Sequence, residues 1–145
     1  MGSPKIKAFL DTSAYLSLLL GDEWSKELKK EIKNWELLAS SLLFLEAERN
    51  IVRLIRESVI SEEVFDEALQ RLKKDSEFFI VRDFSIDLCM TGSYPAGSTP
   101  RSLDLAHIRT AQWFRLNGGL DQFVSFDKTQ VRAARELGLP IWSWA

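Results

Sequence analysis

Two aspartates stand directly after short apolar segments, where a carboxylate can reach a ligand. Asp11 follows residues 7–10, and Asp127 follows residues 123–126. Both segments have the length and composition of buried strands in a parallel sheet. Each aspartate is therefore predicted at the carboxyl end of a strand, which is the edge where α/β proteins bind their ligands.

Two further acids are predicted near the starts of helices that face the same edge. Glu46 follows the apolar residues 42–45, a pattern that indicates a helix start buried beside the sheet rather than a solvated charge. Asp104 lies in the first turn of a helix that we expect to begin at Thr99 and Pro100, because threonine is a favoured N-cap and proline a favoured first residue. Four separate segments thus supply acids to one place.

Helix capping is the alternative explanation for three of these acids. An aspartate between a strand and a helix accepts hydrogen bonds from backbone N–H groups, and Asp127 and Gln130 have the spacing of a capping box. Asp11 fits the same role, and Asp104 would complement the helix dipole from the first turn. Each of these three acids alone is explained by its place at a helix start, whereas the joint pattern of all four acids favours a common site.

Converging carboxylates point to the chemistry of hard divalent cations, which take oxygen ligands in proteins. Without a cation, the four acids would repel one another and would also repel anionic nucleic acid. A bound ion lowers the pKa of water and stabilises the charge that grows on a phosphate. The reaction class that follows from the residues is phosphoryl transfer.

The composition excludes several other kinds of site. There are 19 basic and 21 acidic residues, a net charge of −2, so no overall basic field holds nucleic acid and any contact must be local. His107 is the only histidine and Cys89 the only cysteine, which excludes multi-histidine or multi-cysteine zinc sites and an intramolecular disulfide. We therefore expect a reducing, cytoplasmic location. The apolar residues 15–20 are too few to span a bilayer, and no membrane association is expected.

The segments that position the acids alternate between strands and helices. With 145 residues, we expect one domain over residues 5–145, and we interpret residues 1–4 as an expression scar or a disordered N-terminus. Strands are predicted at residues 7–10, 37–40, 78–81, 123–126 and 139–142. Helices are predicted from residue 22 to Trp35, from 42 to Glu57, after the N-cap Ser61, over 86–90, from Thr99 to 117–119, and up to Gly138. This alternation predicts a three-layer α/β/α sandwich with a mainly parallel sheet.

The motifs around the acids resemble a known family. They are F-L-D-T-S at Asp11, S-S-L-L-F-L-E-A-E-R at Glu46, R-S-L-D-L-A-H-I-R-T-A at Asp104, and F-V-S-F-D-K at Asp127. In this order they resemble the PIN-domain ribonucleases, and most closely the VapC-like toxins of prokaryotic toxin–antitoxin pairs. The resemblance implies a PIN-like fold, and it implies that the four acids bind Mg²⁺ or Mn²⁺.

The resemblance carries further expectations about residues and partners. It implies supporting hydroxyl groups at Thr12 or Ser13 and at Ser125, and cleavage of phosphodiester bonds in an RNA substrate. It also implies inhibition by a VapB-like antitoxin, and a homodimer is expected for such toxins. The alternative function is a catalytically inactive PIN-like module that binds RNA or a protein partner.

Arginines near the acids have two interpretations. Arg49 and Arg53 share one helical face with Glu46, and Arg101 precedes Asp104 by three residues. These side chains would suit an RNA phosphate backbone; equally, Arg53 could pair with a glutamate one turn later on a solvated face. His107 is expected to be a hydrogen-bonded packing residue rather than a general base.

Overall fold

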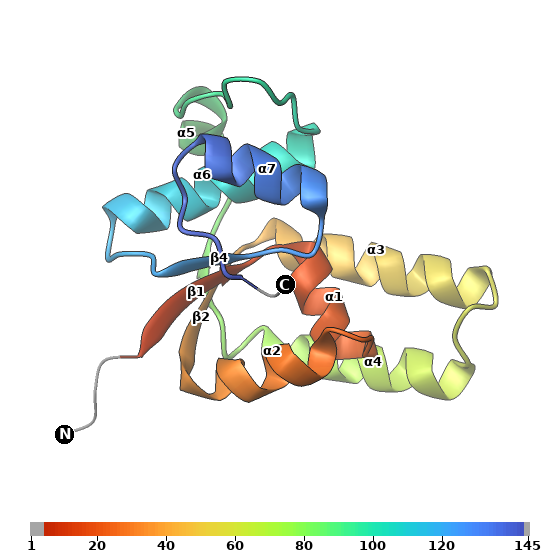
Figure 1. Cartoon of the computed structure of the whole chain (residues 1–145). Helices are drawn as coiled ribbons and strands as arrows, with labels where there is room; N and C mark the ends of the chain where they lie inside the picture. The colour runs from red at the N-terminus through yellow and green to blue at the C-terminus, as the bar shows by residue number, and fades with distance from the viewer. Residues whose placement is uncertain (1–4, 144–145) are drawn as a thin grey trace.

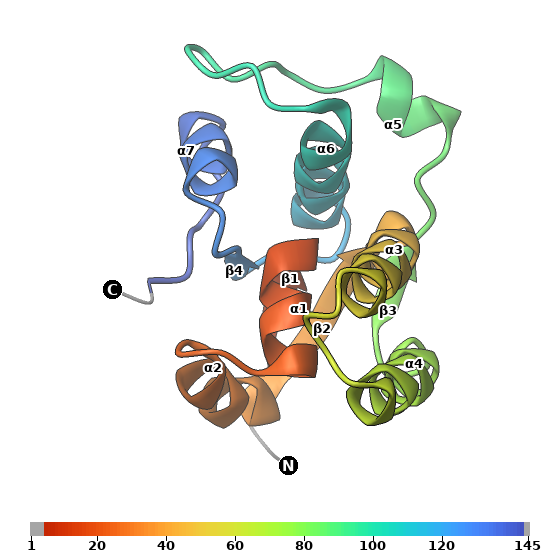
Figure 2. The same ribbon diagram turned by 90° about the vertical axis from the view of Figure 1, so that its right-hand side faces the viewer.

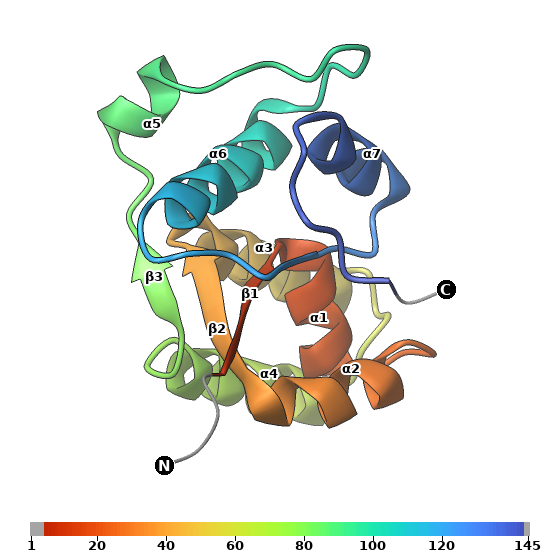
Figure 3. The same ribbon diagram turned by 60° about the vertical axis from the view of Figure 1, so that its left-hand side comes forward.

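The computed structural model describes residues 5–143, so the predicted scar at residues 1–4 lies outside the described residues. Within this range the sheet has four parallel strands in the order β3-β2-β1-β4. They are β1 (Ile6–Leu10), β2 (Trp35–Ser40), β3 (Ile80–Arg82) and β4 (Gln122–Val124). Figure 3 shows β1, β2 and β3 running in the same direction.

Helices cover both faces of this sheet (Figures 1 and 2). One face carries α1 (Thr12–Leu20), α2 (Ser25–Glu31), the 3₁₀ turn η1 (Ile32–Asn34), α3 (Leu42–Arg56) and α4 (Glu62–Asp75). The other face carries α6 (Ser102–Leu116) and α7 (Lys128–Glu136), with α5 (Ile86–Met90) packed beside α6. The predicted three-layer α/β arrangement is confirmed. No helix among residues 5–143 has both the length and the apolar character needed to cross a membrane.

Alternating side chains of β1 enter two separate cores. Ala8 and Leu10 are fully buried against the helices α1 to α4. Phe9 points the opposite way, where it stacks on Phe123 with 5.6 Å between ring centroids and packs against Ile108 of α6. This alternation is the ordinary geometry of a strand. Because β1 is covered on both faces, its carboxyl end and Asp11 are held firmly between the layers.

Several predicted boundaries are confirmed, and one helical prediction is wrong. Ser61 caps α4 by accepting a hydrogen bond from the Val64 N–H at 3.2 Å, and α5 spans the predicted short helix. Trp35, predicted as the last inward residue of a helix, instead opens β2 after η1. Its ring packs edge-to-face on Trp142 at 5.8 Å. The periodicity was misleading because Trp35 is buried through this tertiary contact.

Two predicted segments near the site also differ from the structure. The helix expected from Thr99 begins at Ser102, and the loop before it is fixed by a hydrogen bond from the Ser98 N–H to Glu136 at 3.0 Å. The strand expected at residues 139–142 is reduced to a single bridge between Phe123 and Ile141. Pro140 has no N–H group with which to extend a ladder.

Candidate active site

The carboxyl ends of the strands bring the four predicted acids to one cavity. Asp11 directly follows β1, Asp127 caps the helix after β4, and Glu46 lies on α3, the helix after β2. Asp104 comes from the first turn of α6. This place, next to the central strand β1, is where the chain connections diverge to opposite faces of the sheet.

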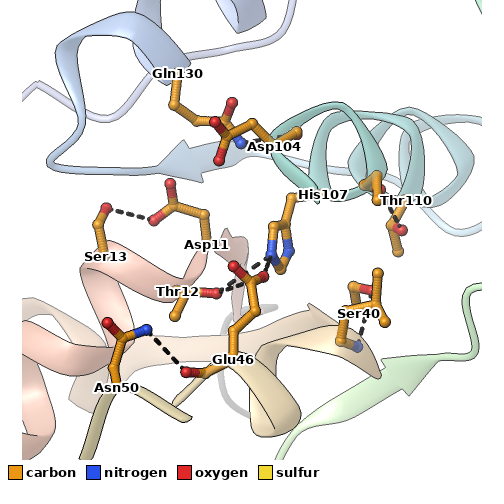
Figure 4. Close-up of polar contacts among 12 residues, drawn as sticks. Asp11, Thr12, Ser13, Ser40, Glu46, Asn50, Asp104, His107, Thr110 and Gln130 are labelled. Atoms are coloured by element: carbon orange, nitrogen blue, oxygen red, sulfur yellow. Dashed lines mark hydrogen bonds and ion pairs between the residues drawn. The ribbon is translucent and has the colours of Figure 1, made fainter. Parts of the chain in front are cut away.

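We call this space the inner cavity; its volume is about 220 Å³. Its lining consists of Asp11, Thr12, Ser13, Leu16, Glu46, Asn50, Asp104, His107 and Asp127. Figure 4 shows Asp11, Glu46 and Asp104 reaching this region from three different elements. The structure therefore brings together residues up to 116 positions apart in the chain.

Asp11 is a buried helix cap. Its Oδ1 accepts a hydrogen bond from the Ala14 N–H at 3.0 Å and another from the Ser13 hydroxyl at 2.7 Å. Burial raises the pKa of the Asp11 carboxyl, and this effect outweighs the lowering by hydrogen bonds from Ser125, Ser13 and the Ala14 backbone. The capping interpretation is thus correct for Asp11, and the same carboxylate also lines the inner cavity.

Glu46 is held by two side chains from other helices. Its Oε1 accepts a hydrogen bond from the Thr12 hydroxyl at 3.1 Å and makes a short contact with His107 Nε2. Burial acts to raise the pKa of the Glu46 carboxyl, but the hydrogen bond and charge of His107, together with Thr12, lower it overall. Glu46 is therefore favoured in its ionised form.

Asp104 and Asp127 lie at the starts of α6 and α7. Asp127 Oδ1 caps α7 by accepting hydrogen bonds from Thr129 and Gln130 at 2.9 and 3.3 Å. Burial raises the pKa of the half-buried Asp104, and the nearby negative charges of Asp127 and Glu46 raise it further. The mutual influence of these acids shows that they share one negatively charged pocket.

The predicted hydroxyl residues connect the two strand ends. The Ser13 hydroxyl accepts a hydrogen bond from the Phe126 N–H at 2.9 Å and lies 3.3 Å from the Ser125 hydroxyl. Ser125 in turn accepts a hydrogen bond from the Asp127 N–H at 3.1 Å. These bonds fix the start of α1 against the segment between β4 and α7, so the positions of Asp11 and Asp127 are coupled.

A wider space, which we call the outer cavity, continues from the inner one. Its volume is about 760 Å³, and the two cavities share Glu46, Asn50, Asp104 and Asp127. Arg49 of α3 and Arg101, the N-cap residue of α6, line the outer cavity. Cationic side chains therefore stand at the mouth of an acidic pocket.

The arginines of α3 separate into two kinds. Arg53 donates to Glu57 at 3.0 Å and to Asn50 at 3.3 Å, and it does not line either cavity. The pairing interpretation is therefore correct for Arg53. Arg49 lines the outer cavity, as the alternative interpretation predicts for a side chain that faces the site.

His107 and Asn50 are site residues whose roles the sequence did not indicate. His107 is almost fully buried and hydrogen-bonded, as expected for a packing residue, but its partner is Glu46. Its position one turn after Asp104 was the available signal, because residues three apart share a helical face. Asn50 lines both cavities one turn after Glu46 and donates to the Glu46 carbonyl at 2.8 Å.

The side chains around the inner cavity have the chemistry of a divalent cation site. Carboxylate and hydroxyl oxygens predominate, and the raised pKa of Asp104 reflects burial and a surplus of negative charge that a cation would relieve. Within residues 5–143, no three acid, histidine or cysteine side chains are grouped so that they already hold an ion. Glu46 contacts His107 through Oε1.

No family model and no curated protein matches the sequence. Solved structures that are similar include VapBC2 from Rickettsia felis bound to a DNA fragment from their promoter, with 15% identity, a TM-score of 0.59, and coverage of 95% of this chain and 100% of that chain. VapC20 from Mycobacterium tuberculosis, a sarcin-ricin loop cleaving toxin, has 17% identity, a TM-score of 0.58, and coverage of 91% and 95%.

A third similar structure is PAE2754 from Pyrobaculum aerophilum, with 16% identity, a TM-score of 0.55, and coverage of 94% of this chain and 83% of that chain. Similarity at these identities establishes a common fold, and it extends over at least 91% of this chain and at least 83% of each of the others. The chain therefore has the PIN-domain fold of the VapC toxins, as the order of its acidic motifs implied.

Proposed function

We propose that this protein is a metal-dependent endoribonuclease that cleaves RNA phosphodiester bonds with Mg²⁺ or Mn²⁺. One observation carries the proposal: four acids from separate segments of a PIN fold line a single cavity of about 220 Å³. Caps alone do not require four carboxylates to face one space. The mutual repulsion evident at Asp104 is tolerable when a cation completes the site.

Asp11, Glu46, Asp104 and Asp127 would hold the cation. When bound, a divalent ion supplies an activated water and stabilises negative charge on the phosphate. The chain itself keeps Asp11 in place through Ser13 and Ala14, and it keeps Asp127 in place through the cap of α7. These hydrogen bonds preorganise the acids before substrate arrives.

The outer cavity is the proposed path of the RNA backbone. Its arginines, Arg49 and Arg101, flank the shared acids and are exposed to solvent. They can bind phosphates on either side of the bond that is cut, which brings an anionic strand to an acidic centre. Binding is therefore local, consistent with the net charge of −2.

We also propose that the protein is the toxin of a VapBC-type pair, with a VapB-like antitoxin as its partner. The fold shared with VapBC2 and with the toxin VapC20 supports this assignment by analogy. The same analogy underlies a homodimer and a cytoplasmic location, where RNA and antitoxin are both present. Co-expression of the neighbouring small gene product should restore growth and block cleavage; failure of both would contradict the toxin role.

One observation favours a second candidate, an inactive PIN-like binding module. Glu46 is engaged by His107 and Thr12, and no group of three potential ligands among residues 5–143 is already arranged around an ion. Such a protein would keep the scaffold and bind RNA or a partner without cutting. The two candidates differ in one measurable property, metal-dependent cleavage.

The deciding experiment incubates total RNA with the purified protein in Mn²⁺, in Mg²⁺ and in excess chelator. The nuclease proposal predicts cleavage by the wild type with metal, loss of cleavage with chelator, and loss in Asp104→Asn. Asp104→Asn is a suitable test variant because it keeps the size of a half-buried side chain and removes its charge. RNA binding without cleavage under every metal condition would establish the binding module instead.

A further inference from the structure

Glu46 is the point at which three helices of the site meet. Its Oε1 accepts from Thr12 of α1 and contacts His107 of α6, while Glu46 itself lies on α3 (Figure 4). Thr12 follows Asp11 directly, and His107 lies one turn after Asp104. Each partner of Glu46 is therefore next to another candidate ligand, so the three acids are positioned relative to one another through this cluster.

The imidazole of His107 has one plausible donor arrangement. His107 is 1% exposed, and its Nδ1 is buried with no hydrogen-bond partner among the described residues. A buried N–H group without an acceptor is rare in proteins, whereas a ring nitrogen without a proton is tolerated more easily. The proton therefore belongs on Nε2, the nitrogen that faces Glu46.

In this arrangement the donors of His107 and Thr12 both face Glu46. Nε2–H donates towards Glu46 and also lies 3.2 Å from the Thr12 hydroxyl, which in turn donates to Glu46 at 3.1 Å. Both contacts use Oε1 of Glu46, and within residues 5–143 no hydrogen bond to its Oε2 is present. The second carboxylate oxygen is therefore available to a cation in the inner cavity.

We propose that His107, together with Thr12, is the positioning residue of Glu46, and that its Nε2–H holds this carboxylate so that Oε2 serves as a ligand to the divalent cation. The inference rests on the proposed function. It assigns the chain's only histidine to the support of a metal ligand, a role in which a ring nitrogen fixes the orientation and charge of the ligand. His107 does not touch the ion or the substrate in this role.

The first test is a long-range ¹H–¹⁵N spectrum of the untagged, metal-free protein. Because the chain has one histidine, the imidazole signals need no assignment. We expect the Nε2 signal to show an attached proton. A ring whose single proton lies on Nδ1 overturns the inference, since Nε2 could not then donate to Glu46.

The second test measures Mn²⁺ affinity by calorimetry, without RNA. His107→Leu should bind Mn²⁺ about 10–100-fold more weakly than the wild type, and His107→Gln, whose amide can donate from a similar place, should recover most of the affinity. Thr110→Val is the matched control: Thr110 is buried on the same helix, and among residues 5–143 its hydroxyl bonds only the Ala106 carbonyl, at 2.8 Å. It should bind Mn²⁺ like the wild type. Equal affinity in folded His107→Leu overturns the inference.

A third test uses a pair of variants at Thr12, and it serves if His107→Leu does not fold. Thr12→Val removes the hydroxyl with little change in shape and should weaken Mn²⁺ binding, while Thr12→Ser should restore it. Unchanged affinity in Thr12→Val then overturns the inference. A wild type that binds Mn²⁺ with this dependence but leaves RNA intact refutes only the nuclease proposal, whereas a wild type that binds no Mn²⁺ refutes both.

Discussion

Gln130 donates a hydrogen bond from its side-chain amide to the backbone carbonyl of Asp104 over 2.9 Å. Gln130 is 1% exposed and lies in the first turn of α7, which Asp127 caps. The bond therefore joins the first turns of α6 and α7, the two helices that present Asp104 and Asp127 to the inner cavity. A contact made through a backbone carbonyl fixes the position of the turn without using the carboxylate.

We expect Gln130→Leu to reduce metal-dependent RNA cleavage on the order of tenfold, because small displacements of catalytic groups are costly. The apolar side chain fills the space but cannot donate to the Asp104 carbonyl. Steady-state cleavage and a melting curve would check this prediction. Gln70→Leu, on an exposed position of α4, is the control and should leave cleavage unchanged. Wild-type cleavage by Gln130→Leu would show that the hydrogen bond between the starts of α6 and α7 is not needed for cleavage.

Asp11→Asn should stabilise the metal-free protein at neutral pH while abolishing cleavage. Burial raises the folded-state pKa of Asp11 above its ordinary value of 3.8, so the folded protein holds this proton more tightly than the unfolded chain. Ionisation of Asp11 therefore lowers the free energy of unfolding as the pH rises from 3.8 through the raised pKa, and the loss persists at higher pH. Asparagine keeps the cap without the charge.

The measurement is the melting temperature in chelator from pH 4 to pH 8. Asp11→Asn should melt at a higher temperature than the wild type at pH 7, on the order of 2–4 °C for each 1 kcal/mol gained in the free energy of unfolding. The difference between the two melting temperatures should become smaller towards pH 4. Added Mn²⁺ should raise the melting temperature of the wild type and not that of the variant. A variant that melts lower at every pH would contradict the assigned cost of the buried charge.

Arg49 and Arg53 offer a matched pair on one helix. Arg49→Gln should raise the KM for RNA about fivefold and weaken the salt dependence of binding, because an exposed phosphate contact contributes about 1 kcal/mol. Arg53→Gln should change KM little, since Arg53 is already engaged by Glu57 and Asn50. Cleavage kinetics at two salt concentrations would check both variants. A larger rise in KM for Arg53→Gln than for Arg49→Gln would place the RNA on the other side of α3.

Ser13→Ala should destabilise the protein by about 1–2 kcal/mol, because a hydroxyl with two buried or half-buried partners is removed. The Ser13 hydroxyl donates to Asp11 at 2.7 Å and accepts from the Phe126 N–H at 2.9 Å. Chemical denaturation would measure the loss, with Ser93→Ala in the exposed loop before α6 as the control. Equal stability of the two variants would show that the link between α1 and the end of β4 is dispensable.

Much of the fold follows from local pattern in the sequence. The strand before Asp11, the N-cap at Ser61 and the end of α7 near Gly138 are set by short-range rules of burial, capping and backbone conformation, and each is found where those rules place it. Gly138 adopts a φ of 77°, which favours glycine. The helical placement of Trp35 was wrong because its burial comes from Trp142, a residue far along the chain.

The sequence by itself determined which acids are present, that they follow strands or begin helices, and hence that parallel strands would gather them at one edge. Only the tertiary structure decided how each acid is engaged there. Glu46 bonds His107 and Thr12, 61 and 34 residues away, and Arg53 pairs along its helix while Arg49 faces the cavity. Such choices depend on how closely helices approach and on which groups lose contact with water, and no pattern within one segment carries that information.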